Sequence, residues 1–198
     1  MLSEKGIFRG SKSSRRWLRR RIPMTIWFTS DHHFGHTNII RFCGRPYSSV
    51  EEMDEALVER WNSVVGSNDE VWHLGDFAHR CGPNRMREIF SSLRGRAVHL
   101  VLGNHDRKHT LELPWASVQH YAELRIDGRL IVLFHYGLRA WNQSGRGSWS
   151  LYGHSHGSLP GTPSSSDVGV DAWNFRPVSL DEIAEQHRGR MAQLPEPE

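Results

Sequence analysis

Five short apolar segments of this chain each end at residues that can bind a metal ion, and this arrangement constrains the fold more than any other feature. The first segment, 24–28, is rich in β-branched and aromatic residues, as buried β-strands are. Helical patterns separate the first three segments, which predicts an α/β protein. The strands are expected at 24–28, 71–74, 97–102, 130–134 and 149–152.

Three segments carry helical patterns. Ser49 and Glu52 form a capping-box pattern, and apolar residues then recur at helical spacing through 53–65. A second amphipathic helix is expected at 84–93. A third begins after the capping sequence at 179–182.

The alternation of strands and helices stops after the third strand. Segment 121–134 is predicted to form a hairpin around the Asp127-Gly128 turn, and 168–170 is expected to be one more strand. A single domain fits the length of 198 residues. The predicted organisation is a basic, disordered extension at 1–22, the domain at 23–188 and a disordered tail at 189–198.

The positive charge of the chain is confined to one end. Residues 1–22 contain eight basic residues and one acid, so they carry +7 and the remaining residues carry −4, giving the net +3. The basic character is therefore weak evidence for a nucleic-acid partner of the domain, and a nucleic-acid-binding role of the extension stays open.

Several protein classes are excluded by composition. The chain has no apolar stretch of 18 residues, so no membrane partner is expected. Its two cysteines, Cys43 and Cys81, exclude a disulfide scaffold and a thiolate zinc finger, although one bridge between them stays open. We interpret them as reduced thiols of a cytoplasmic protein.

The polar residues at the strand ends are suited to transition metals. In open α/β sheets the ligand site lies at the carboxyl ends of the strands, so these residues are expected to converge. Imidazole, carboxylate and amide donors suit Mn²⁺, Fe, Zn²⁺, Co²⁺ or Ni²⁺. Strand alternation is expected to place both residues of each x-separated pair on one side of the backbone. The candidate residues are Asp31, His33, Asp76, Asn104, His105, His135, His154 and His156.

These motifs, taken in order, resemble those of the calcineurin-like metallophosphoesterases, with similarity to a small bacterial and phage-type branch. The resemblance covers residues 24 to about 175 and rests on Asp31-x-His33, Gly75-Asp76, Gly103-Asn104-His105-Asp106, His135 and Gly153-His154-x-His156. It implies a four-layer α/β/β/α sandwich of two mixed sheets flanked by helices.

The resemblance also implies residue roles. One metal would be held by Asp31, His33, Asp76 and His156, and the other by Asp76, Asn104, His135 and His154. Asp76 would be shared by two ions roughly 3.5–4 Å apart. His105 would stabilise the phosphate or protonate the leaving group, whereas Asp106 would orient the surrounding loop.

Several further histidines and arginines lie within or between these motifs. His32 is expected to point away from the metals, while His36 and His79 are candidates for supporting or substrate-side roles. Arg139 and Arg146, in the loop between His135 and His154, are candidates for substrate binding because guanidinium groups match phosphate oxygens.

The resulting hypothesis is a dinuclear, metal-dependent phosphoesterase, with manganese as the favoured ion. A metal-bridging hydroxide would attack the phosphorus of a phosphomonoester or phosphodiester, and nucleotides are among the candidate substrates. Two alternatives stay open. The first is an inactive binding module with this fold, and the second is a nucleic-acid-directed phosphodiesterase tethered by residues 1–22.

Overall fold

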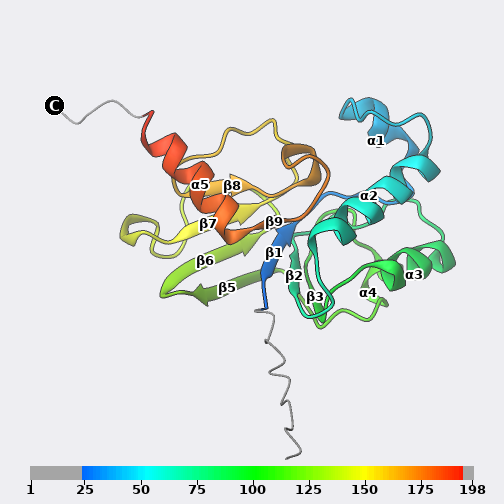
Figure 1. Ribbon diagram of the computed structural model, residues 1–198, viewed down its shortest axis with the longest axis horizontal. Coiled ribbons are helices and arrows are strands. Elements are labelled where there is room, and N and C mark those ends of the chain that lie inside the picture. The colour runs from blue at the N-terminus through cyan, green and yellow to red at the C-terminus, as the bar shows by residue number, and fades with distance from the viewer. Residues whose placement is uncertain (1–23, 194–198) are drawn as a thin grey trace, which may run out of the picture.

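The computed structural model describes residues 24–193, which form two mixed β-sheets packed against each other and flanked by helices (Figure 1). The first sheet has the strand order β4-β3-β2-β1-β9, and the second has the order β5-β6-β7-β8. The expected α/β class with two mixed sheets is confirmed. The basic extension expected at 1–22 lies outside the described residues.

The first sheet contains the three strands that precede the first three motifs. Strands β1 to β4 run parallel, and β9 pairs antiparallel to β1. The carboxyl ends of β1, β2 and β3 therefore lie along one edge of the sheet. Their bounds are β1 Ile26–Thr29, β2 Glu70–His73, β3 Ala97–Val101, β4 Ser117–Gln119 and β9 Val178–Ser179.

The second sheet begins with the expected hairpin. Its two turn residues, Asp127 and Gly128, both have positive φ, which matches the twist of a two-residue hairpin turn. Strands β6, β7 and β8 then run parallel. The bounds are β5 Tyr121–Ile126, β6 Arg129–Phe134, β7 Trp149–Tyr152 and β8 Ser165–Asp167.

The strand expected at 168–170 is wrong. The strand is β8, which ends at Asp167, and Val170–Ala172 forms a 3-10 helix instead. Val168 and Val170 are buried in two different hydrophobic clusters, so their apolar character reflects core packing of a connecting segment. Only an isolated bridge between Gly169 and Ser30 continues the pairing here.

The helices begin where the caps predict. The Ser49 side chain accepts a hydrogen bond from the Glu52 amide at 3.1 Å, and Ser179 forms a full capping box with Glu182. The last helix reaches Met191, three residues beyond the boundary expected at 188. The bounds are α1 Thr37–Phe42, α2 Val50–Val64, α3 Pro83–Ser92, α4 Lys108–Leu111 and α5 Leu180–Met191, with a further 3-10 helix at Ser144–Arg146.

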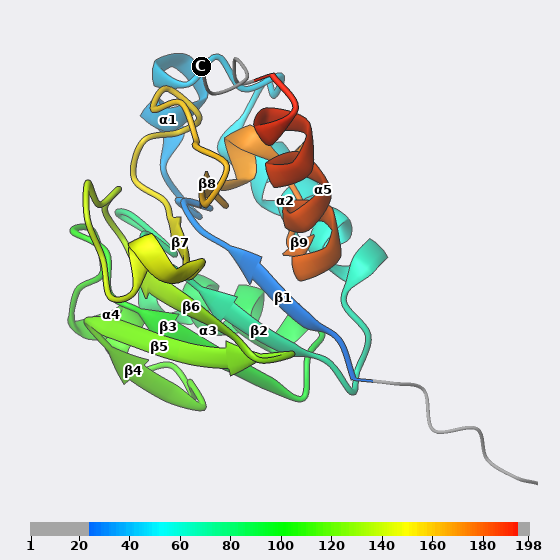
Figure 2. The same cartoon turned by 90° about the vertical axis from the view of Figure 1, so that its left-hand side faces the viewer.

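Two apolar layers hold the sandwich together. Between the sheets, Phe28 of β1 and Leu74, which follows β2, form one hydrophobic cluster with Ile131 and Leu151 of the second sheet. On the outer face of the first sheet, Trp61 of α2 packs with Val71 and its neighbours. Figure 2 shows the second sheet in front of the first, with α5 beside β1 and β9. The packing fixes how the strand ends of the two sheets meet.

The structure also describes both cysteines and the helices that were considered as membrane spans. Cys43 and Cys81 are both free, so they do not form the bridge that the sequence left open. Within residues 24–193, none of the helices is long and apolar enough to cross a membrane.

Candidate metal centre

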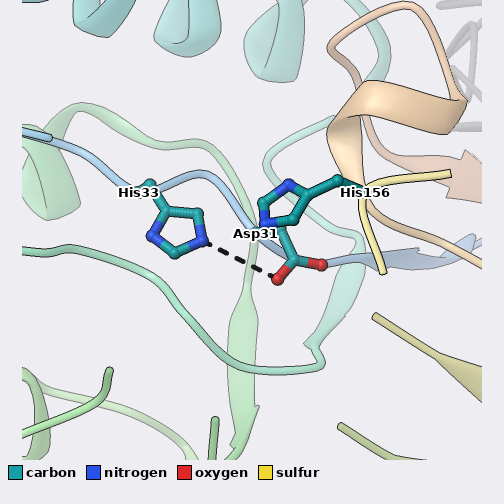
Figure 3. Close-up of side chains that lie close together, drawn as sticks. All are labelled: Asp31, His33 and His156. Carbon is teal, nitrogen blue, oxygen red and sulfur yellow. Dashed lines mark ion pairs between the residues drawn. The ribbon is translucent and has the colours of Figure 1, made fainter. Parts of the chain in front are cut away.

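The predicted ligands converge at the carboxyl ends of strands from both sheets. Their donor atoms form compact groups in which all atoms lie within 4.8 Å of one another. We call Asp31, His33 and His156 the inner half of the site; Figure 3 shows these three side chains close together. We call Asn104, His135 and His154 the outer half. Asp76 groups with His135 and His154, and also with His33 and His105.

Most of these ligands have left-handed backbone conformations. Five of the seven predicted ligands have φ between +48° and +65°: Asp31, His33, Asp76, His154 and His156. Each such residue costs about 1–3 kcal/mol and persists only where its surroundings hold it. The prediction that strand alternation places the paired ligands on one side of the backbone is therefore wrong. These ligands lie outside the strands, because β1 ends at Thr29 and β7 at Tyr152. The side chains converge because the chain turns sharply at these five residues.

Backbone hydrogen bonds hold the turns after β1 and β2 to each other. The amide of Asp31 donates to the carbonyl of Gly75, and the amide of His33 donates to the carbonyl of Asp76, both at 3.0 Å. Gly75 has φ +95°, and a Cβ there would lie 2.5 Å from the Gly103 nitrogen. Only glycine fits this crossing of the turns after β2 and β3.

Asp106 fastens the second and third turns without facing the donor cluster. Its carboxylate accepts hydrogen bonds from the amides of Asp76, Phe77 and Gly103 at 2.9 to 3.0 Å. Three main-chain donors on one carboxylate fix the two loops relative to each other. The prediction that Asp106 orients the loop agrees with this geometry.

Asp31 is fully buried and only half of its carboxylate is satisfied. Its Oδ2 accepts hydrogen bonds from the Ser30 hydroxyl and the His154 amide, and a Cβ at Gly153 would lie 2.5 Å from this oxygen. Its Oδ1 is buried and has no hydrogen-bond partner among the described residues. Burial raises the pKa of Asp31 to about 7 despite the nearby histidines. A buried carboxylate oxygen without a hydrogen-bond partner is costly unless a cation or a proton binds to it.

Two of the predicted ligand histidines have their Nδ1 atoms hydrogen-bonded to groups outside the donor cluster. His135 Nδ1–H donates to the Leu74 carbonyl at 2.7 Å, and His156 Nδ1–H donates to Asp171 Oδ2 at 2.7 Å. Such bonds fix the ring and leave Nε2 as the donor atom for a metal. Burial opposes protonation, but the bond to Asp171, the nearby Cys43 and the charge of Asp31 together outweigh it and raise the pKa of His156 to about 10.

Asp76 is the residue that connects the two halves. Its Oδ1 accepts from the His105 amide at 2.8 Å. Its Oδ2 lies 3.5 to 4.0 Å from the Nε2 atoms of three imidazoles, those of His33, His105 and His135. Burial alone would raise its pKa, but the hydrogen bond and charge of His135 hold the pKa of Asp76 well below the usual range. The carboxylate therefore stays ionised at the centre of the site.

The donor set fits divalent transition metals. Asp31 Oδ1 and both ring nitrogens of His33 are buried and lack hydrogen-bond partners within residues 24–193. His135 Nε2 faces Asn104 Oδ1 at 3.1 Å, so two metal-capable atoms of the outer half already point at each other. Buried groups without partners are costly unless something binds them. The nitrogen and oxygen atoms are those preferred by Mn, Fe, Zn, Co or Ni ions.

Arg45 is an important residue that the sequence reasoning missed. Its buried guanidinium forms a bidentate pair with Asp171 at 2.8 Å and donates to the carbonyls of Asp31 and His32. It therefore braces both the turn after β1 and the carboxylate that holds His156. No motif signals this residue, because its partners are backbone carbonyls and a residue 126 positions away.

His32 points away from the donor cluster, as expected. The Gly75 amide donates to His73 Nδ1 at 3.2 Å, so the proton of the neutral His73 ring lies on Nε2. This Nε2–H donates to His32 Nδ1 at 2.9 Å, and both rings are buried. The two histidines form a neutral, hydrogen-bonded pair behind the inner half.

The other candidate histidines lie at the edge of the site. The rings of His36 and His79 are 4.4 Å apart, and the ring of His79 is 4.5 Å from that of His105. All three side chains are partly exposed. They form one edge of the donor cluster, which is compatible with the supporting or substrate-side roles predicted for His36 and His79.

The structure does not bring the two candidate arginines to the donor cluster. Arg139 lines a separate pocket with Tyr152 and Leu159, and Arg146 is exposed in the 3-10 helix at 144–146. Within residues 24–193, the cavity beside His105 has neither arginine in its lining. Their role in substrate binding stays a prediction.

Comparisons with known proteins identify the family of the chain and a solved structure with the same fold. A model of the calcineurin-like phosphoesterase superfamily domain matches residues 24–170. An uncharacterized protein of Methanocaldococcus jannaschii is 34% identical over 166 residues, covering 80% of this chain and 88% of its own. The Gene 66 protein of Mycobacterium phage L5 is 30% identical over 190 residues, covering 79% and 91%. The crystal structure of an Aquifex aeolicus protein of unknown function shares the fold, with a TM-score of 0.66, 21% identity and coverage of 83% and 100%.

Proposed function

Because the chain belongs to the calcineurin-like phosphoesterase superfamily, whose members are metal-dependent, we propose that it hydrolyses a phosphate ester with two divalent metal ions. The observation that carries this proposal is the position of Asp76. Its carboxylate lies between the donor groups of the inner and outer halves, as a bridging ligand must.

The two halves divide the ligands between the ions. The inner ion would be held by Asp31, His33, Asp76 and His156, and the outer ion by Asp76, Asn104, His135 and His154. When bound, such a pair of ions neutralises phosphate charge and makes a bound water acidic near neutral pH. We propose manganese as the favoured ion, since the donors are nitrogen and oxygen atoms throughout.

His105 is the residue proposed to act on the substrate directly. Its amide is bonded to Asp76, and its ring Nε2 lies 4.0 Å from Asp76 Oδ2 while the side chain is about one third exposed. The ring therefore reaches solvent at the point where a phosphate would approach. There it donates a hydrogen bond to a phosphate oxygen or a proton to the departing oxygen.

Other residues position this machinery. The Asp106 carboxylate ties the turn that carries Asp76 to the turn that carries His105. Arg45 balances the charge of Asp171 and holds the Asp31 carbonyl. These contacts hold the donor atoms in fixed positions relative to one another.

The test is a hydrolysis assay of the protein reconstituted with Mn²⁺, using para-nitrophenyl phosphate and its bis ester. We expect metal-dependent turnover, a loss of at least about 100-fold in His105→Ala and a larger loss in Asp76→Ala. His109→Ala, at an exposed position on α4, is the matched control and should keep full activity.

Two results would contradict the proposal. Full activity of Asp76→Ala would exclude a shared pair of ions. A folded, Mn²⁺-loaded wild-type protein without activity on any ester would instead support the binding-module alternative.

A further inference from the structure

A cavity of about 570 Å³ opens beside the candidate metal centre. Asp76, His105, His154 and His156 contribute to its lining, so a phosphate bound at the metals would lie at its wall. The other lining residues are not among the predicted ligands and come from two segments. They are Ile39, Phe42 and Cys43 at α1, and Ser155 and Ser158 in the loop after β7.

Phe42 is unusual among the phenylalanines of the chain. Its side chain is 63% exposed, whereas Phe28, Phe34 and Phe77 are fully buried. A large apolar side chain left open to solvent is common on a protein surface, but this one lines the cavity that the metal ligands line. An exposed aromatic ring in a binding cavity offers a surface that a ligand can cover.

Neighbouring groups flank the Phe42 ring. The Arg41 guanidinium lies over it, with Cζ 5.3 Å from the ring centre, and the His36 ring lies edge-on with centres 6.3 Å apart. These contacts occupy part of the ring surface and restrict its orientation. The ring is thus available to the cavity in a defined position rather than as a free surface group.

The serines on the opposite segment are polar and have their hydroxyl protons engaged. Ser155 Oγ donates to Asp167 Oδ2 at 2.6 Å, and Ser158 Oγ donates to the Ser155 carbonyl at 2.6 Å. Each hydroxyl oxygen can still accept a hydrogen bond. The cavity therefore combines an apolar aromatic wall with acceptors, a combination that suits a flat ring carrying N–H groups.

We propose that Phe42 is a specificity-determining residue that packs against a planar aromatic group of the substrate. The substrate is then a phosphate ester of an aryl group or of a nucleoside, and the ring of either source stacks on the Phe42 side chain. This inference rests on the proposed function, because the phosphate must be anchored at the metal centre for its ester group to reach Phe42.

The test measures binding instead of turnover. Phenylphosphonate and cyclohexylphosphonate share the anchoring group and differ in ring planarity, and neither can be hydrolysed as an ester. Titration calorimetry with the full-length, Mn²⁺-loaded protein should show phenylphosphonate binding about two- to tenfold more tightly. Phe42→Leu should abolish this preference, while Phe42→Tyr should keep it.

The matched control is Tyr121→Leu, which removes an exposed aromatic ring on β5 that does not line the cavity. It should leave the preference unchanged. Thermal unfolding of each variant checks that folding is intact, which is expected because Phe42 is 63% and Tyr121 40% exposed.

A second pair of ligands distinguishes the two sources of the ring. A nonhydrolysable nucleoside 5′-phosphonate is compared with the same sugar phosphonate lacking the base. A nucleobase that stacks on Phe42 should tighten binding about fivefold or more, and Phe42→Leu should remove this gain. If the base adds nothing while the phenyl preference holds, the aromatic group belongs to an aryl ester.

The inference is overturned if wild type binds phenyl and cyclohexyl phosphonates equally, or if Phe42→Leu weakens both to the same extent. This outcome is separate from failure of the proposed function. Lack of turnover with an intact Phe42-dependent preference would reject hydrolysis and keep the aromatic subsite.

Discussion

The inner and outer halves of the site use the same kinds of ligand but are supported in different ways. In the inner half, Asp31 and His33 are at most 1% exposed, and His156 is held by Asp171. In the outer half, His154 is exposed and Asn104 is partly exposed, although His135 is buried. The inner half is therefore more enclosed by protein than the outer half, in which His154 faces the solvent.

The supports differ in chemistry as well as in depth. Side chains distant in sequence, Arg45 and Asp171, hold the inner half through charged hydrogen bonds. The main-chain carbonyl of Leu74 holds His135 in the outer half. A side-chain substitution can remove the support by Arg45 or Asp171, but it cannot remove a main-chain carbonyl such as that of Leu74. The two halves should therefore respond differently to mutation and pH.

The largest effect is expected for Arg45→Met, which breaks the support of the inner half. Asp171 would be left as a buried carboxylate without its guanidinium partner, and the carbonyls of Asp31 and His32 would lose their donor. Removing one partner of a buried pair costs about 3–5 kcal/mol of folding free energy. Urea denaturation of the metal-free protein measures this loss.

Arg85→Met is the matched control. Arg85 is about half exposed and lies 3.9 Å from Asp54, so its removal should cost about 1 kcal/mol or less. Equal losses for the two variants would show that the inner half is not specially supported.

The next effect separates the two halves directly. Asp171→Asn weakens the acceptor of the His156 Nδ1–H while conserving the shape of the side chain. Changes in such outer contacts typically weaken metal binding by about 10- to 100-fold. Stepwise calorimetric titration with Mn²⁺ should show one weakened site and one unchanged site. An equal change at both sites would contradict the division into halves.

A smaller effect concerns pH and the neutral pair behind the inner half. Burial lowers the pKa of His73 to about 3 and also lowers that of His32, so both stay neutral in the folded protein. Below pH 6.5 the unfolded chain takes up protons that the folded chain does not. Folding stability should therefore be full above pH 6.5 and fall by about 1.4 kcal/mol per pH unit for each histidine as pH drops towards 3.

Denaturation of the metal-free protein at a series of pH values measures this slope. His73→Gln should reduce it, since one of the two groups no longer titrates. His109→Gln, at an exposed position, should leave it unchanged. A stability that is constant between pH 6.5 and 5 would exclude a buried neutral pair.

The smallest effect on stability is expected for His154→Ala in the outer half. The side chain is exposed, and its main-chain amide, not its ring, contacts Asp31. The free energy of unfolding should change by no more than about 0.5 kcal/mol. Metal analysis after dialysis should nevertheless show the loss of one ion. Marked destabilisation would mean that the outer half is also part of the folding core.

Sequence alone predicted the α/β class and a set of candidate ligands that the structure places close together. Each ligand motif follows an apolar strand, and the carboxyl ends of neighbouring parallel strands must share an edge. The role of Asp106 is implied by the family resemblance, although its partners Asp76 and Phe77 lie 30 and 29 residues away. Local pattern was sufficient to place each motif at the end of its strand.

Other features depend on contacts that no local pattern reveals. The left-handed turns at Asp31 and His156 require partners from other strands, so strand alternation gave the right convergence for the wrong reason. Arg45 acts on residues far along the chain. Val168 and Val170 are buried for packing, which their apolar character could not distinguish from a strand.

The candidate metal centre lies where the two sheets meet. Asp31 and Asp76 follow strands of the first sheet, while His135 and His154 follow strands of the second. The spacing of the donors therefore depends on how the two sheets are aligned. The apolar layer around Ile131, which lies between the sheets, determines that alignment. We expect a conservative change in this layer to shift the donor atoms of the proposed metal centre without altering a predicted ligand. The rate of the proposed reaction should then respond to sheet-to-sheet alignment more strongly than the thermal stability of the fold does.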